Sequence, residues 1–140
     1  MGKVKDIHVL LLEDDLETLS RVLQCLYELQ NSLKDVNIAV TTFSEYEPVE
    51  KYLNQAEKNI YDIVILDRDT FEGGSFHALD LNKYEPDKVI GISSIPPYNE
   101  ELRAKGVKRL VHKDYQNLDA FIEKVKAHLE EMLLQVLGRR

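Results

Sequence analysis

The chain has 140 residues, of which 44% are hydrophobic and 31% charged, and its formal net charge is −7 at pH 7. We expect residues 1–140 to form a single globular domain with a core of its own. The acidic balance argues against direct nucleic-acid binding, and no apolar run approaches the roughly 20 residues that span a bilayer. The single cysteine, Cys25, excludes an internal disulfide framework and fits a reducing compartment, so we expect a cytoplasmic protein.

The first half of the chain is predicted to alternate between buried strands and helices. The predicted elements are a strand at 7–12, a helix from Leu16, a strand at 36–43, a helix from Ser44 to about Gln55, and a strand at 63–66. The last of these is a run of four apolar residues, which is typical of a strand buried on both faces. It ends in Asp67, and Asp69 follows two residues later.

The second half continues the alternation with shorter helices. The predicted elements are a short helix around Phe76 and Leu79, a strand at 88–93 stopped by Pro96-Pro97, a brief helix capped by Asn99 and closed by Gly106, a strand at 107–112, and a long helix from about 118 to 137. Apolar residues from Met132 to Leu137 extend that helix, and we expect them to leave apolar surface beyond the sheet. This surface would serve a signalling linker or a homodimer.

Five strands alternating with helices predict an α/β fold. In this length the pattern fits a flavodoxin-like, doubly wound, five-stranded parallel sheet in the order 2-1-3-4-5, with helices on both faces. Ligands bind such sheets at the carboxyl ends of the strands. Those ends are therefore where a functional site is expected.

Acidic, hydroxyl and amine side chains gather at those strand ends. They are Glu13, Asp14 and Asp15 after the first strand, Asp67 and Asp69 after the third, Ser93 and Ser94 after the fourth, and Lys113 after the fifth. Converging carboxylates repel one another and need a cation, and oxygen ligands suit Mg²⁺. A phosphoryl group would be offset by the metal and Lys113, while Ser93 donates a hydrogen bond. This chemistry predicts a magnesium-assisted phosphoryl acceptor with Asp67 as the nucleophile.

Four segments in order resemble the receiver domain of two-component response regulators. They are Leu-Leu-Leu-Glu-Asp-Asp at 10–15, Asp-Ile-Val-Ile-Leu-Asp at 62–67, Ile-Ser-Ser at 92–94 and His-Lys at 112–113. The resemblance implies phosphoryl transfer from a histidine kinase or phosphotransfer protein to Asp67. It also implies Mg²⁺ bound by an acidic pair, by Asp67 and by the backbone carbonyl of Asp69. Ser93 matches the family's switch hydroxyl, and Lys113 matches its phosphate-contacting lysine.

Two points stay open in this interpretation. The acidic pair is Glu13 with Asp14 if the strand is aligned, and Asp14 with Asp15 if the helix is aligned. The side chain of Asp69 is equally compatible with a solvated loop position and with a local role.

The sequence also departs from the family's pattern. Asp114 stands where a proline usually follows the lysine, Leu110 replaces a frequent aromatic residue, and Thr70-Phe71 replaces the usual Met-Pro. The alternative to a phosphorylated receiver is therefore an atypical receiver that acts through protein contacts alone. A third class is a small phosphatase with Asp69 as its general acid. In the first interpretation the protein is not an enzyme, and its state is relayed to an output domain or a partner protein.

Overall fold

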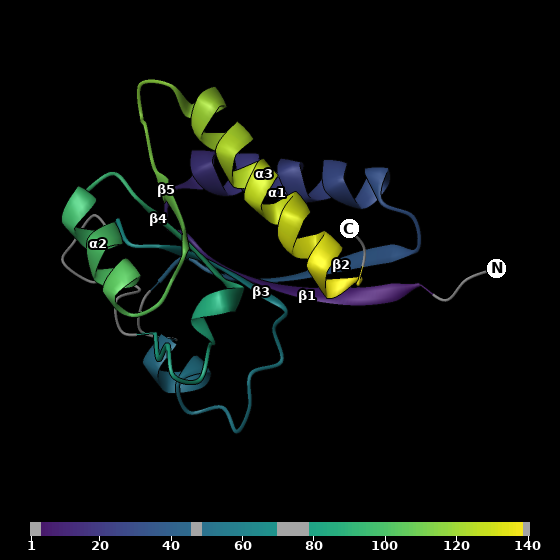
Figure 1. Ribbon diagram of the computed structural model, residues 1–140, viewed down its shortest axis with the longest axis horizontal. Coiled ribbons are helices and arrows are strands. Elements are labelled where there is room, and N and C mark those ends of the chain that lie inside the picture. The colour runs from purple at the N-terminus through teal and green to yellow at the C-terminus, as the bar shows by residue number, and fades with distance from the viewer. Residues whose placement is uncertain (1–3, 46–48, 70–78, 139–140) are drawn as a thin grey trace.

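The computed structural model describes residues 4–45, 49–69 and 79–138 (Figure 1). In chain order its elements are β1 (Lys5–Leu12), α1 (Leu16–Ser32), β2 (Val36–Phe43), the π-helical turn η1 (Val49–Leu53), β3 (Ile63–Asp67), the 3-10 turn η3 (Pro86–Lys88), β4 (Val89–Ser93), α2 (Pro96–Ala104), β5 (Arg109–His112) and α3 (Leu118–Val136). None of the helices within these residues is long and apolar enough to cross a membrane.

The strands form one parallel sheet in the order β2-β1-β3-β4-β5, which confirms the predicted topology. The register pairs Leu12 with Leu66, Asp67 with Ile92 and Ser93 with His112. Because all strands run the same way, their carboxyl ends lie along one edge of the sheet. The chemistry-bearing residues that follow the strands are therefore brought to a common edge.

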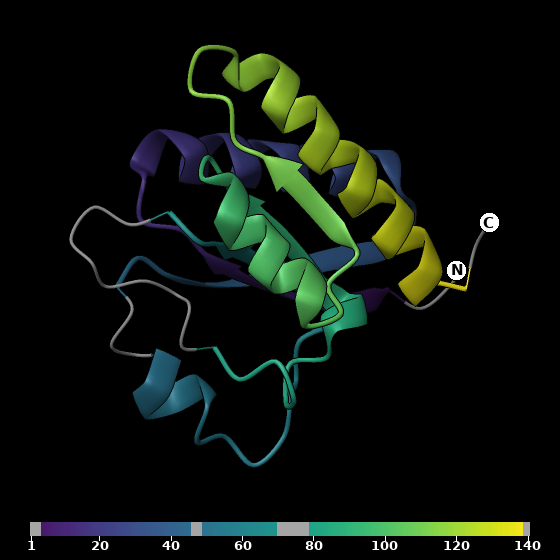
Figure 2. The same cartoon turned by 60° about the vertical axis from the view of Figure 1, so that its left-hand side comes forward.

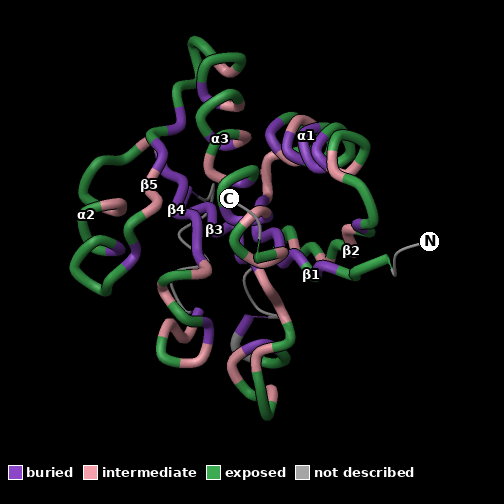
Figure 3. Tube along the Cα trace, turned by 45° about the vertical axis from the view of Figure 1, so that its right-hand side comes forward, coloured by how far each residue is buried: buried purple, intermediate pink, exposed green. Residues whose placement is uncertain are grey.

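Two hydrophobic cores lie on opposite faces of the sheet. Alternate residues of β1 show the division, since Ile7, Val9 and Leu11 belong to one core while Leu10 and Leu12 belong to the other. Strand residues point to the two faces in turn, so a strand covered on both sides is apolar throughout. Figure 3 shows the result as a continuous buried band along the central strands.

α1 and α3 cover the first face side by side (Figure 1). Cys25 of α1 is buried in this core, and burial raises the pKa of its thiol to about 11, so the side chain serves packing. Met132 and Leu133 of α3 are 3% and 0% exposed. The expectation of apolar surface at this end of the helix was wrong for these two residues, because they close the core instead.

The second face is covered by shorter elements than the sequence predicted. The expected helix from Ser44 to about Gln55 is the five-residue turn η1, with residues 46–48 outside the described part. The short helix predicted around Phe76 falls mostly outside the described residues, and 79–81 form a bend and turn. α2 packs on this face against β4 and β5 (Figure 2).

α2 also begins earlier than predicted. Its first residues are Pro96 and Pro97, and the N-cap is Ile95 rather than Asn99. Proline has no amide hydrogen and its fixed φ matches the first turn of a helix, so the pair that was expected to stop the strand begins the helix instead. Asn99 lies inside the helix, and its side-chain amide donates to the carbonyl of Val111 at 3.2 Å.

Gly91 of β4 lies where α2 and β5 approach the strand backbone closely. A Cβ atom there would lie 2.5 Å from Leu102 Cδ1 and 2.8 Å from Leu110 Cδ2. We expect Gly91→Ala to lower the free energy of unfolding by about 1–3 kcal/mol through overpacking. Urea denaturation measures this change. In a Leu102→Ala background the same substitution should cost less, and an equal or larger cost there would contradict the steric explanation.

Candidate functional site

The acids after β1 have two different environments. Asp15 is the N-cap of α1, and its carboxylate accepts hydrogen bonds from the Thr18 amide at 3.2 Å and the Thr18 hydroxyl at 2.5 Å. Burial alone would raise the pKa of Asp15, but these hydrogen bonds lower it. Glu13 is 1% exposed and points into the protein. The structure thus places Asp15 on the helix end and Glu13 at the sheet edge.

Glu13, Asp14 and Asp67 form a carboxylate cluster at the carboxyl ends of β1 and β3. One carboxylate oxygen from each lies within 4.8 Å of the others. Oxygen ligands in this number suit a hard cation such as Mg²⁺, which keeps several waters in addition. The residues present therefore fit the predicted metal. A role for the carbonyl of Asp69 as a further ligand stays a prediction.

Lys113 lies against the same carboxylates. Its ammonium Nζ is 3.0 Å from Glu13 Oε1 and 3.4 Å from Asp67 Oδ2, and the side chain is fully buried. The backbone amide of Lys113 donates to the carbonyl of Ser93 at 2.9 Å, which fixes the start of the loop after β5. Residues 14, 67, 93 and 113 were expected to converge. Asp14 and Lys113 lie beside Asp67, and the Ser93 side chain is connected to Asp67 through Asp69.

One ammonium faces two buried carboxyl groups, and their protonation follows from this imbalance. Burial raises the pKa of both Glu13 and Asp67, and the mutual interaction raises that of Asp67 further, against the lowering effect of Lys113. Burial alone would lower the pKa of Lys113, but the two carboxylates raise it. In the metal-free protein the two carboxyl groups therefore tend to hold a proton between them, and a divalent cation can take the place of that proton.

Asp69 makes contacts that the sequence did not predict. Its carboxylate accepts hydrogen bonds from the Ser93 hydroxyl at 2.6 Å, from the Ser94 amide at 2.8 Å, and from the Tyr115 hydroxyl at 3.2 Å. Its own amide donates to Asp67 Oδ1 at 3.0 Å. Burial would raise the pKa of Asp69, but the hydrogen bonds from Ser93 and Ser94 lower it. Asp69 therefore has a local structural role and is not a solvated loop acid.

Tyr115 was also missed by the sequence reasoning. Besides its hydrogen bond to Asp69, its ring lies 5.0 Å from Lys113 Nζ, within the range of a cation–π contact. Burial raises the pKa of its hydroxyl to about 12, so it remains a hydrogen-bond donor at neutral pH. Its position two residues after Lys113 is a signal that sequence analysis could have used.

Arg68 connects the end of β3 to α2. Its side chain is 2% exposed, and Nη2 lies 2.8 Å from Glu101 Oε2. The guanidinium carbon is 5.6 Å from the ring centre of Tyr98, also on α2. A buried arginine could not be expected here from the sequence, since Arg68 stands between two acids and its partner is 33 residues away.

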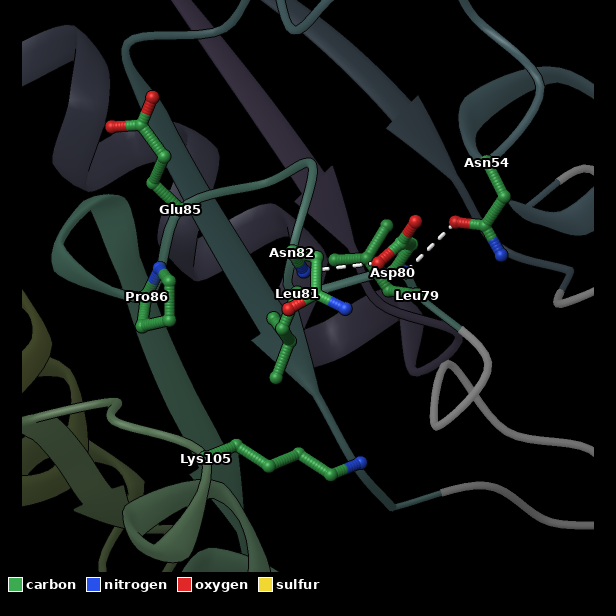
Figure 4. A pocket seen from close by; sticks show the side chains of 8 residues that line it. All are labelled: Asn54, Leu79, Asp80, Leu81, Asn82, Glu85, Pro86 and Lys105. Carbon is green, nitrogen blue, oxygen red and sulfur yellow. Dashed lines mark hydrogen bonds between the residues drawn. The ribbon is translucent and has the colours of Figure 1, made fainter.

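A separate pocket lies away from the carboxylates (Figure 4). It has a volume of about 810 Å³ and is formed by the segments that lead into β4 and β5, including Asp80, Glu85 and Lys105. The amide of Asp80 donates to Asn54 Oδ1 at 2.8 Å across its wall. Because these segments precede the strands, the pocket is at their amino ends and takes no part in the site at Asp67.

Comparisons with known proteins give the same fold. No protein-family model matches the chain, and no curated protein matches it. Among solved structures, the phosphorylated cyanobacterial phytochrome response regulator RcpA has a TM-score of 0.70 at 19% identity, over 92% of this chain and 95% of RcpA. The Mn²⁺-bound response regulator Rcp1 has a TM-score of 0.64 at 15% identity, over 86% and 90%. The bacteriophytochrome response regulator AtBRR has a TM-score of 0.55 at 19% identity, over 86% and 92%. The chain therefore has the fold of response-regulator receiver proteins.

Proposed function

We propose that the protein is a response-regulator receiver that accepts a phosphoryl group on Asp67 in a Mg²⁺-dependent reaction. The observation that carries this proposal is the buried Asp67 carboxylate, with Lys113 Nζ at 3.4 Å and two further acids within 4.8 Å. A cation-binding cluster beside a carboxylate and a buried ammonium is suited to receive a dianionic group. The similar fold of the phosphorylated RcpA and of the Mn²⁺-bound Rcp1 supports the same proposal.

The proposed reaction is an in-line displacement. A carboxylate oxygen of Asp67 attacks the phosphorus of a phosphohistidine on a kinase or phosphotransfer protein. The new O–P bond forms as the N–P bond breaks, and the electron pair stays on the imidazole nitrogen. Glu13, Asp14 and Asp67 would hold Mg²⁺, which supplies charge neutralisation at the transferring oxygens. Lys113 offsets the remaining charge from within the protein. The protein is a stoichiometric acceptor in this scheme, not an enzyme with a separate substrate.

The signal would leave the site through the loops that contact it. Asp69 links the end of β3 to the start of the β4–α2 loop, and Arg68 links it to α2 itself. A charge added at Asp67 would therefore bias the arrangement of the face formed by α2, β5 and α3. An output domain or partner protein would read that face, in the cytoplasm. A homodimer through α3 would use the same surface.

The test is covalent labelling with a small acyl phosphate. We expect acetyl phosphate with Mg²⁺ to add one phosphoryl group to the protein, as measured by intact mass, and EDTA to prevent the addition. Asp67→Asn should abolish labelling. Asp62→Asn is the matched control, because Asp62 precedes the same strand at its opposite end and accepts a hydrogen bond from the His8 amide. It should label like the parent.

Three outcomes would contradict the proposal. Absence of label in the parent, under conditions that label a known receiver, favours the atypical receiver that acts through protein contacts alone. Continuous release of inorganic phosphate from an added phosphoester, lost in Asp69→Asn, favours the phosphatase. Label that persists in Asp67→Asn places the acceptor elsewhere.

A further inference from the structure

The hydrogen-bond donors around Asp69 form an anion-binding arrangement. Besides the Lys113 ammonium, the donors at this edge include the Ser93 hydroxyl, the Ser94 amide and the Tyr115 hydroxyl. All three of these already donate to the Asp69 carboxylate. The Ser93 hydrogen bond is 2.6 Å long, which is in the range of a charge-assisted bond to a carboxylate.

Ser93 also shows which of its possible acceptors takes the hydroxyl hydrogen. Its oxygen is 2.6 Å from Asp69 Oδ1 and 3.2 Å from the Ile95 carbonyl, while the Ile95 amide donates to it at 2.9 Å. One hydroxyl has a single hydrogen, and the shorter contact to a charged acceptor is the stronger. The Ser93 hydroxyl is therefore committed to Asp69 and is 0% exposed to solvent.

The same donors are the ones that a phosphoryl group on Asp67 would need. Asp69 is joined to Asp67 by the hydrogen bond from its amide to Oδ1, at 3.0 Å. A phosphoryl group on Asp67 has three equatorial oxygens, which require donors beyond Lys113 and a cation. The Ser93 hydroxyl and the Ser94 amide lie near, because Asp67 pairs with Ile92 at the end of β4. The Asp69 carboxylate thus accepts hydrogen bonds from the same donors that a phosphoryl group on Asp67 would need.

We propose that the Asp69 carboxylate is a built-in competitor for the phosphoryl group. It holds Ser93, Ser94 and Tyr115 in their anion-bound positions while Asp67 is unmodified. This inference rests on the proposed function. Phosphorylation must displace Asp69 from these donors, since two anionic groups cannot share one set of hydrogens. The start of the β4–α2 loop is therefore already hydrogen-bonded to an anion before phosphorylation. Phosphorylation of Asp67 is slowed because these hydrogen bonds must first be broken.

The experiment compares initial rates of labelling by limiting acetyl phosphate with Mg²⁺. We expect Asp69→Ala to label about tenfold faster than the parent, a factor that corresponds to about 1.4 kcal/mol. Asp69→Asn, which keeps the shape and loses the charge, should lie between them and covers the case in which the alanine variant does not fold. Asp114→Asn is the matched control, because Asp114 is an exposed acid next to Lys113 whose carboxylate accepts a hydrogen bond from the Gln116 amide, in the turn after β5. It should label like the parent.

The outcomes separate this inference from the function on which it rests. Faster labelling of both Asp69 variants supports the competitor, as does label that appears in the variants alone. Equal or slower labelling in variants that fold, with a labelled parent, overturns the competitor and leaves the proposed function standing. A purely structural role for Asp69 would give that slower result. If neither the parent nor any variant takes label, the proposed function falls and the competition falls with it.

Discussion

Lys113→Met is expected to lower the free energy of unfolding of the metal-free protein by about 3–5 kcal/mol at neutral pH. The Lys113 ammonium is fully buried and contacts both Glu13 and Asp67. Methionine keeps most of the volume but leaves two carboxyl groups together without their cation. The cost is the desolvation of those groups, which Lys113 offsets in the parent.

The loss should grow as the pH rises from about 5 to 8. The pKa values of Glu13 and Asp67 are raised in the folded state, so the contribution of these groups to stability is present at low pH. It is lost as the pH rises through the folded-state pKa, because the unfolded chain releases the proton first. In Lys113→Met this loss of stability is larger, because the ammonium that lowers the pKa of both carboxyl groups is gone. Urea denaturation in EDTA at several pH values measures it.

Lys108→Met is the control for this prediction, since Lys108 is exposed and precedes the same strand. It should change stability by no more than about 0.5 kcal/mol. A Lys113→Met protein as stable as this control would show that the ammonium is not the partner of the buried carboxylates.

Asp67→Asn is expected to act in the opposite direction and to stabilise the metal-free protein by about 1–3 kcal/mol at pH 7 to 8. The substitution removes one of two carboxyl groups that share Lys113, and the remaining Glu13–Lys113 pair at 3.0 Å is neutral overall. Asparagine can still accept the hydrogen bond that the Asp69 amide donates to residue 67. The gain in stability should shrink as the pH falls toward the ordinary aspartate pKa of 3.8, and below that value the parent carboxyl is protonated in both states.

Magnesium supplies the second half of this test. Millimolar Mg²⁺ should stabilise the parent, because it binds only the folded cluster, and should stabilise Asp67→Asn less. Asp87→Asn changes an exposed acid near the amino end of β4 and should behave like the parent in both measurements. Destabilisation by Asp67→Asn across the whole pH range would mean that the carboxyl group is not under electrostatic stress.

The sheet could be predicted from the sequence because buried parallel strands leave a strong local signal. The apolar run at 63–66 and the acid that ends it were enough to place Asp67 at the edge of the sheet. The order of the strands followed from the alternation of elements, and it brought the acids, Ser93 and Lys113 together. The strand ends determine the edge at which these residues lie, and no loop conformation is needed for that placement.

The contacts of Arg68 and Asp69 could not be predicted in the same way. Both residues follow the last strand position, where the period of 2 no longer fixes the direction of a side chain. Arg68 points toward Glu101 on α2, whereas Asp69 points toward Ser93 and the β4–α2 loop. The start of α2 was mispredicted because a proline pair predicts a stop for the preceding strand, whereas Pro96 and Pro97 form the first turn of the helix.

Arg68 and Asp69, the two residues that follow β3, therefore contact different segments: Arg68 contacts α2, and Asp69 contacts the β4–α2 loop. We call these contacts two branches, and they differ in their exposure to water. Arg68 is buried, but its partner Glu101 is 57% exposed on the side chain, so mobile ions reach one end of that link. The Ser93 hydroxyl that binds Asp69 is shielded from solvent. Ionic strength would consequently weaken the branch to α2 and leave the branch to the β4–α2 loop almost unchanged. In the proposed receiver, β3 would therefore be coupled to one segment through a contact that depends on salt and to another through a contact that does not.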